Sequence, residues 1–140
     1  MNMNIALMAH ENKDDLMVQF CTAYTGILSQ HTICATSGTG NAVMEATGLP
    51  IHLFLPSVHG GCEQIGARIA YNEIDLVLIF NDPTDPSFSE RVSYISNLCD
   101  QHAVPFATNV ATAEMLILGL SRGDLDWRNI VYPKTKPFTA

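Results

Sequence analysis

The residues of this chain best suited to chemistry begin with a short segment rich in hydroxyls and glycines, Thr36-Ser37-Gly38-Thr39-Gly40. It follows an apolar run over 31–35, which predicts a short buried strand, and precedes 42–47, which predicts a helix ending at Gly48. Free backbone N–H groups at a helix N-terminus, the positive end of the helix dipole and nearby hydroxyls can together hold a phosphate. The segment therefore predicts an anion site.

The glycines and hydroxyls of this segment also have a plainer interpretation. Gly38 and Gly40 permit a positive φ and a close approach of the backbone to a ligand. However, Thr36 or Thr39 can equally be the N-cap of the helix, followed by a tight turn, and spacing alone leaves both interpretations open. The segment lacks the Gly-Lys-Ser/Thr ending of a Walker A loop, so that motif is excluded.

A second group of candidates surrounds two glycines, Gly60 and Gly61, which follow Ser57 in a predicted loop. Cys62 and Glu63 come next and open a predicted helix. A thiol at a helix N-terminus has a lowered pKa and can act as a nucleophile, although a small residue without a chemical role is the favoured interpretation of Cys62. Glu63 can be a base, or a first-turn acid that the helix dipole favours.

The elements that must position these residues follow from the hydrophobic pattern. Apolar runs predict strands at 4–9, 31–36, 51–55, 76–80 and 105–108. Helical patterns follow them over 15–30, 42–47, from 62 or 63 to 70, around 92–99, and over 111–120. Strands that alternate with helices predict a three-layer α/β/α domain with a five-stranded parallel sheet.

Polar clusters follow several of the predicted strands. His10 to Asp14 follows the first strand, and Asn81 to Asp85 follows the fourth. In parallel sheets, ligands bind beyond the carboxyl ends of the strands, so one shared crevice is expected there. Asp82 is a site candidate on this basis, although an aspartate before Pro83 is also ordinary turn chemistry.

Length and composition bound the function. The chain has 140 residues, is 47% hydrophobic and carries a net charge of -7, which predicts one domain over 1–140, with an irregular tail over about 130–140. Excess negative charge disfavours nucleic acid and anionic membranes as partners. No apolar run is long enough to span a membrane. Lys134 and Lys136 can reach a phosphate, but such tail residues are more often solvated.

The cysteines and histidines indicate no metal site and no cofactor. The four cysteines form no C-x-x-C pair, and three of them lie inside apolar elements, which predicts reduced thiols in a cytoplasmic protein. The five histidines show no metal-ligand spacing.

Several blocks of this sequence resemble the methylglyoxal synthase family. They run in order from residue 4 to about residue 130, which makes the resemblance specific. The blocks are Ile5-Ala6-Leu7-Met8-Ala9-His10-Glu11, Ala35-Thr36-Ser37-Gly38-Thr39-Gly40-Asn41, Glu45-Ala46-Thr47-Gly48, Gly60-Gly61-Cys62-Glu63-Gln64-Ile65-Gly66-Ala67, Asp82-Pro83 and Pro105-Phe106-Ala107-Thr108-Asn109-Val110-Ala111-Thr112-Ala113-Glu114.

The resemblance implies a lyase that converts dihydroxyacetone phosphate to methylglyoxal and inorganic phosphate. It also implies a homo-oligomer, usually a hexamer, and a fold shared with the regulatory domain of carbamoyl phosphate synthetase. Carried over onto matching or neighbouring positions, the substrate-binding residues are His10, Glu11, Lys13, Asp14, Thr36, Ser37, Gly38, Thr39, Gly40, Ser57, Gly60 and Gly61.

This sequence departs from the family pattern where the chemistry is expected. Cys62 stands at the position of the catalytic aspartate, and the nearest carboxylate is displaced by one residue, to Glu63. Asp14 stands where the family has a phosphate-binding lysine, with Lys13 one place early. No histidine occurs between Asp82 and Gln101, so the second catalytic histidine of the family is missing.

Two functions follow from the pattern and its departures. The first is a weak lyase of the methylglyoxal synthase type, with Glu63 as the base and with Cys62 and Asp82 at the catalytic positions. The second is a non-catalytic module that binds phosphorylated metabolites through the Thr36–Gly40 segment.

Overall fold

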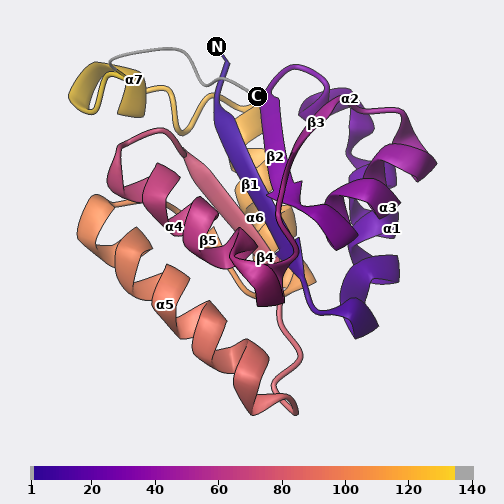
Figure 1. The fold of residues 1–140 in the computed structure, drawn as a ribbon. Coiled ribbons are helices and arrows are strands. Elements are labelled where there is room, and N and C mark those ends of the chain that lie inside the picture. The colour runs from indigo at the N-terminus through magenta and orange to yellow at the C-terminus, as the bar shows by residue number, and fades with distance from the viewer. Residues whose placement is uncertain (1, 135–140) are drawn as a thin grey trace.

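The computed structural model describes residues 2–134, and its centre is one sheet of five parallel strands (Figure 1). The strands are β1 (Asn4–Ala9), β2 (Thr32–Thr36), β3 (Ile51–Phe54), β4 (Leu76–Phe80) and β5 (Phe106–Ala107), in the spatial order β3-β2-β1-β4-β5. The predicted parallel sheet is confirmed, with three strands shorter by one or two residues. The strand β1 pairs with β2 on one side and with β4 on the other, so the direction of winding of the sheet changes at β1. This switch opens a crevice beyond the carboxyl ends of β1 and β4.

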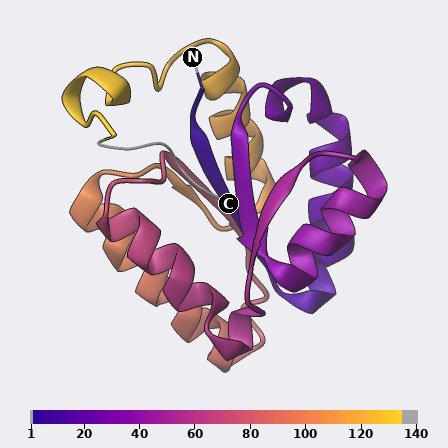
Figure 2. The same ribbon diagram turned by 45° about the horizontal axis from the view of Figure 1, so that its top comes forward.

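Helices cover both faces of the sheet. The longer helices are α1 (Asp14–Ala23), α3 (Ser37–Thr47), α4 (Gly61–Ala70), α5 (Pro86–His102) and α6 (Val110–Ser121). The short ones are η1 (Glu11–Lys13), α2 (Thr25–Leu28), η2 (Ser57–His59) and α7 (Arg128–Val131). Side chains of α1, α3 and α6 join the core on one face and those of α4 and α5 join the core on the other, and Figure 2 shows the α1–α3 and α4–α5 pairs on opposite sides.

The residues of β1 contribute to two hydrophobic cores, one on each face of the sheet. Ile5 and Leu7 are buried against the α1, α3 and α6 side, whereas Ala6 and Met8 are buried against α4 and α5. Successive residues of a strand point to opposite faces, so a strand covered on both sides must be apolar throughout. This is the continuous apolar run that the sequence shows.

Two predicted helices differ from the structure. The helix predicted over 15–30 is two helices, α1 and α2, separated at Tyr24. The helix α3 begins at Ser37 rather than after Asn41, because Thr36 is already the extended N-cap residue, with φ -60° and ψ 149°. The helix α7 ends at Val131, and most of the tail predicted to be irregular, over about 130–140, lies outside the described residues.

The positive φ that a glycine permits is not found at either glycine of α3. In the described chain, positive φ among glycines occurs at Gly48, Gly60 and Gly123, and so not at Gly38 or Gly40. Gly40 is needed for close packing instead, because a Cβ there would lie 2.4 Å from Cδ2 of Leu53 on β3.

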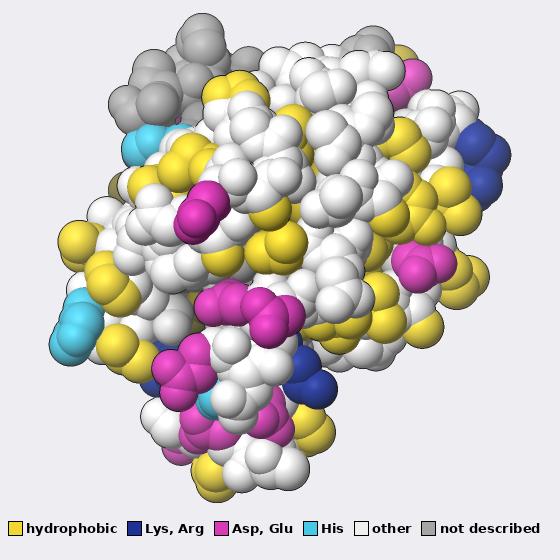
Figure 3. Space-filling view, turned by 90° about the vertical axis from the view of Figure 1, so that its right-hand side faces the viewer, with side chains coloured by type: hydrophobic (Ala, Val, Ile, Leu, Met, Phe, Trp, Pro, Cys, Tyr) yellow, Lys and Arg dark blue, Asp and Glu magenta, His cyan; other side chains and the backbone are white. Residues whose placement is uncertain are grey.

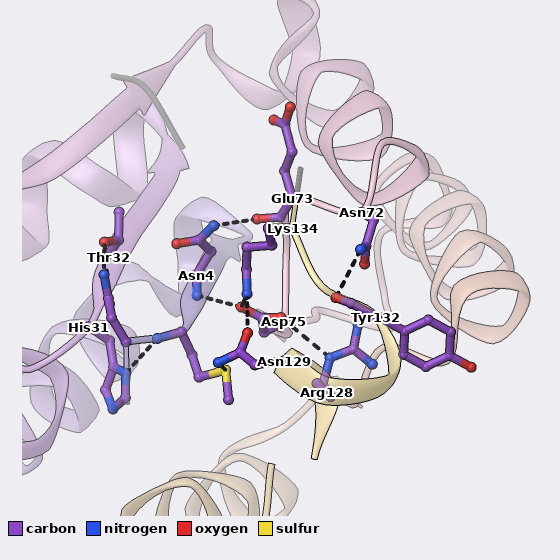
Figure 4. A network of polar contacts seen from close by, with 12 residues as sticks. Asn4, His31, Thr32, Asn72, Glu73, Asp75, Arg128, Asn129, Tyr132 and Lys134 are labelled. Carbon is purple, nitrogen blue, oxygen red and sulfur yellow. Dashed lines mark hydrogen bonds and ion pairs between the residues drawn. The ribbon is translucent and has the colours of Figure 1, made fainter. Parts of the chain in front are cut away.

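A network of charged groups joins both ends of the described chain at the amino-terminal edge of the sheet (Figure 4). The buried Asp75 carboxylate accepts a hydrogen bond from the Asn4 backbone N–H at 2.8 Å and forms ion pairs with Lys134 at 2.8 Å and Arg128 at 3.4 Å. Arg128 also donates to the Ala103 carbonyl. Lys134 is thereby placed at the edge opposite the crevice, while Lys136 lies outside the described residues. Within residues 2–134, no helix is long and apolar enough to cross a membrane.

Candidate functional site

A pocket of about 250 Å³ lies in the crevice beyond the carboxyl ends of the strands. Its walls come from the end of β1, from η1, from the first turns of α1 and α3 and from the first two turns of α5, with η2 on the remaining side. Figure 3 shows acidic side chains gathered around a histidine on the lower part of one face. The lining residues are Ala9, His10, Glu11, Asp14, Gly38, Thr39, Pro56, Ser57, Val58, Asp85, Phe88 and Arg91.

His10 and Asp85 form a hydrogen-bonded pair across the switch point. His10 Nδ1 accepts a hydrogen bond from the Asn12 N–H at 3.0 Å, so Nε2 carries the proton and donates to Asp85 Oδ2 at 2.9 Å. The other oxygen of Asp85 accepts from the Ser87 and Phe88 N–H groups, because Asp85 is the N-cap of α5. The bond from His10, and after it the bond from the Phe88 N–H, lowers the pKa of Asp85.

Asp82 holds the turn before α5 in place. Its Oδ1 accepts hydrogen bonds from the hydroxyl and the N–H of Thr84 at 2.6 and 3.0 Å, and its Oδ2 accepts from the Asn12 amide at 3.2 Å. These bonds, led by that of the Thr84 hydroxyl, lower the pKa of Asp82 to about 2. Asp82 does not line the pocket, so the structure places it behind Asp85 as a turn residue.

The carboxylate of Asp14 also lines the pocket, and its pKa is shifted in the opposite direction from those of Asp82 and Asp85. Burial removes water from this carboxylate and raises its pKa, and a hydrogen bond from the Thr39 hydroxyl, at 2.8 Å, lowers it in part. The Thr39 Oγ1 also accepts the Ala9 N–H at 3.1 Å, which ties the start of α3 to the end of β1. A half-buried carboxylate with a raised pKa is suited to accept a proton.

Arg91 brings a cation into the pocket, and neither the sequence motifs nor the family resemblance pointed to it as a site residue. It lies on α5 one turn after Phe88, and its guanidinium carbon is 5.4 Å from the centre of the Phe88 ring. The available signal was helix spacing, because a helix capped by Asp85 places Phe88 and Arg91, three residues apart, on one face.

The predicted catalytic residues of α4 lie outside the pocket lining. Cys62 is fully buried, and its Sγ lies 3.8 Å from the Arg91 carbonyl oxygen. Burial raises the pKa of the Cys62 thiol to about 11, so the lowered pKa considered for a helix N-terminus is wrong here. Glu63 is exposed on the first turn of α4.

The remaining predicted residues divide between the pocket and its support. Glu11, Gly38, Thr39 and Ser57 are in the lining, as are His10 and Asp14. Lys13, Thr36, Ser37, Gly40, Gly60 and Gly61 are outside it. Among residues 2–134 there is no group of three or more histidine, cysteine or acidic side chains that could hold a metal ion.

The chain is similar to known proteins over nearly all its length. A family model described as an MGS-like domain matches residues 16–108. The methylglyoxal synthase of Caldicellulosiruptor saccharolyticus is 56% identical over 133 residues, which is 94% of each chain. That of Geobacillus thermodenitrificans is 51% identical over 135 residues, 96% of this chain and 94% of the relative.

A solved structure agrees with these relatives. The crystal structure of methylglyoxal synthase from Elizabethkingia anophelis superposes with a TM-score of 0.77 at 33% sequence identity, and the match covers 83% of this chain and 77% of that one. With the five-stranded parallel sheet and the crevice at its switch point, these matches show that the chain belongs to the methylglyoxal synthase family.

Proposed function

We propose that this protein is a carbon–oxygen lyase that converts dihydroxyacetone phosphate to methylglyoxal and inorganic phosphate. The observation that carries the proposal is the content of the pocket: a half-buried carboxylate, a histidine–aspartate pair and a guanidinium face one cavity at the switch point of the sheet. The names of the relatives support the same reaction.

The reaction needs a base, a donor for the developing enediolate and a cation or N–H group for the leaving phosphate. The base removes a proton from the hydroxymethyl carbon next to the carbonyl. The electron pair forms the enediolate, and the carbon–oxygen bond to phosphate then breaks, which leaves the enol of methylglyoxal. No oxidant, reductant or water is consumed. The Nε2–H of His10 donates to Asp85, and it becomes available to the carbonyl oxygen of a substrate when the bound substrate displaces the Asp85 carboxylate.

Asp14 is the carboxylate that we propose as the base. It lines the pocket and its pKa is raised by burial, whereas Glu63, the base predicted from the sequence, is exposed and outside the lining. Asp14→Asn keeps the size and the acceptor toward Thr39 but cannot take a proton. We expect it to abolish release of methylglyoxal and phosphate, while Glu63→Gln retains the rate of the unmodified protein.

If Glu63→Gln abolishes the release of products and Asp14→Asn retains it, the base is Glu63, as the sequence predicts. Both variants need a check by circular dichroism, so that a loss of rate is not a loss of fold. If neither variant changes a measurable rate, neither carboxylate is the base.

A second function, a module that binds a phosphorylated metabolite without turnover, is favoured by one observation. A fully buried thiol with a pKa raised to about 11 occupies position 62, where the resemblance predicts a catalytic acid. Calorimetry with dihydroxyacetone phosphate, followed by an assay for product in the same sample, separates the two functions. Binding without any methylglyoxal supports the module.

We further propose that the protein is a cytoplasmic homo-oligomer. Met115 and Leu118 are three residues apart on α6 and are 74% and 44% exposed, and Ile130 on α7 is 80% exposed, which supports a contact between copies. The four cysteines are all free and buried, in keeping with a reducing compartment. Light scattering on a size-exclusion column tests the assembly, and a monomer at micromolar concentration contradicts it.

A further inference from the structure

Arg91 is the cation of the pocket. Among the lining residues it is the single lysine or arginine, beside three carboxylates, those of Glu11, Asp14 and Asp85. The other basic residue near the entrance, Lys13, is outside the lining, and Lys134 is engaged by Asp75 at the opposite edge. An anion that enters this pocket therefore meets one guanidinium and otherwise negative or neutral side chains.

Most of the N–H donors of the Arg91 guanidinium have no acceptor in the described chain. Within residues 2–134 it has no ion pair, and the hydrogen bond that it makes is a long one, 3.4 Å from Nη1 to the Ser87 hydroxyl. Its Nε is buried without an acceptor in the described chain. The Asp85 carboxylate, which also lines the pocket, is already bonded to His10 and to the N–H groups of α5. The ring of Phe88 lies within cation–π distance of the guanidinium.

At the start of α3, where the sequence predicts a phosphate site, the chain itself engages the Thr39 hydroxyl and the Ser37 N–H. The Asp14 carboxylate lies there, bonded to the Thr39 hydroxyl at 2.8 Å, and the Ser37 N–H is directed to the Leu55 carbonyl at 3.4 Å. A phosphate beside Asp14 would meet a like charge in a half-buried site, where screening by water is weak. The two ends of the pocket therefore differ: the Asp14 end repels an oxyanion and the Arg91 end attracts it.

We propose that Arg91, with the neighbouring edge of η2 at Ser57, is the subsite for the phosphate group of the ligand. This inference rests on the proposed function for the identity of the ligand, a small phosphate monoester. It places the phosphate toward α5 and η2, and the reacting carbon toward Asp14. A planar guanidinium suits this task, because two parallel N–H donors match two phosphate oxygens.

The test measures binding of inorganic phosphate to the full chain by titration calorimetry, which needs no turnover. Arg91→Gln should weaken the affinity at least about tenfold, and Arg91→Lys, which keeps the charge but loses the planar fork, by about two- to fivefold. The matched control is Arg122→Gln, because Arg122 is an exposed arginine paired with Asp124 and outside the pocket. It should leave the affinity unchanged. Asp14→Asn should not weaken the binding.

Two results overturn the assignment: unchanged affinity in Arg91→Gln while Thr39→Ala weakens it, or no phosphate binding by the unmodified protein. Titration with dihydroxyacetone phosphate separates an ester subsite from one for free phosphate, since an ester subsite gives the same loss in Arg91→Gln with both ligands. A loss confined to inorganic phosphate contradicts the ester subsite. If the unmodified protein binds phosphate through Arg91 but produces no methylglyoxal, the proposed lyase function fails and the subsite stands.

Discussion

At the residue scale, the carboxylates around the pocket differ in the groups that stabilise their ionised form. Asp82 is held by the hydroxyl and N–H of Thr84, and Asp85 by His10 and the start of α5, so both have lowered pKa values. Asp14 is half-buried and accepts a hydrogen bond from the Thr39 hydroxyl, and burial raises its pKa. Glu11 is exposed at the entrance. These differences support Asp14 as the proposed base, and we expect Glu11 to repel an anion from a longer distance.

The Thr39 hydroxyl should set the lower end of the pH profile. A base must be unprotonated, so kcat/KM rises with pH through the pKa of Asp14. Thr39→Val removes the hydrogen bond that lowers this pKa and should move the acidic limb to higher pH, whereas Thr39→Ser should leave it in place. Thr39→Val should also cost about 1–3 kcal/mol of stability, because it leaves the Ala9 N–H without its acceptor. An acidic limb that does not move argues against Asp14 as the base.

Glu11 should weaken substrate binding through its charge. Glu11→Gln removes a negative charge from the pocket wall, and an exposed charge interaction is worth about 0.2–1 kcal/mol. We therefore expect the KM for dihydroxyacetone phosphate to fall by up to about fivefold at low salt, with little change in kcat. The control is Glu45→Gln, an exposed glutamate of α3 outside the pocket. A KM that is equal in all three proteins would show that Glu11 exerts no repulsion.

At the element scale, glycines set how closely helices approach the strands beside the pocket. A Cβ on Gly61 would lie 2.0 Å from the Leu55 carbonyl oxygen, so α4 can begin there only with glycine. The Gly61 N–H also closes the turn through the Pro56 carbonyl at 2.9 Å. This turn carries η2 and its pocket residues. Gly38, in contrast, has no atom within 4 Å of the place of a Cβ.

These two glycines make a matched pair for a stability measurement. Gly61→Ala should lower the free energy of unfolding by about 2–3 kcal/mol, because the added methyl group collides with backbone that cannot turn away. Gly38→Ala should raise it by up to about 1 kcal/mol, because alanine favours a helix and its methyl group meets nothing. Urea denaturation measures both. If Gly61→Ala is as stable as the unmodified protein, the start of α4 is free to move away from Leu55.

Whether the sequence predicts a site residue depends on the helix or strand that carries it. The sheet was predictable because a strand buried on both faces is apolar throughout, as 76–80 is, and His10 was predictable because it directly follows such a strand. Arg91 was not, because it lies in the second turn of α5, away from any strand end. The bond between Asp14 and Thr39 joins two helices and depends on tertiary packing, which local spacing does not contain. The sequence predicts the start of α3 too late because glycines are typical of turns, whereas Gly40 lies inside the helix and permits close packing against Leu53.

At the scale of the whole molecule, charge is distributed between two edges of the sheet. The carboxyl-terminal edge holds the pocket and its exposed acids. The amino-terminal edge holds Asp75 with Arg128 and Lys134, almost entirely out of water, and Arg128 is 0% exposed. The Nη2 atom of Arg128 has no acceptor in the described chain. Buried ion pairs of this kind destabilise a fold strongly when one partner is removed.

Asp75 should therefore matter for stability and not for chemistry. Asp75→Asn leaves two cations at the edge without a counter-charge and should cost about 3–5 kcal/mol. The comparison is Asp124→Asn, which breaks the exposed pair with Arg122 and should cost no more than about 1 kcal/mol. Urea denaturation measures both, and a KM measured on the folded fraction of Asp75→Asn should be unchanged. Equal stability of the two variants would contradict a structural role for Asp75.

The contacts around Asp75 also govern the order of events during synthesis. A ribosome adds residues in sequence, so all five strands and Asp75 have been made before Arg128 and Lys134. Until then the Asp75 carboxylate has no cation, and a lone charge is not buried without one. The amino-terminal edge of the nascent sheet stays open to water for that interval. We therefore expect a chain released before Arg128 to be cut by proteases at this edge, and a chain that extends through Lys134 to be protected there.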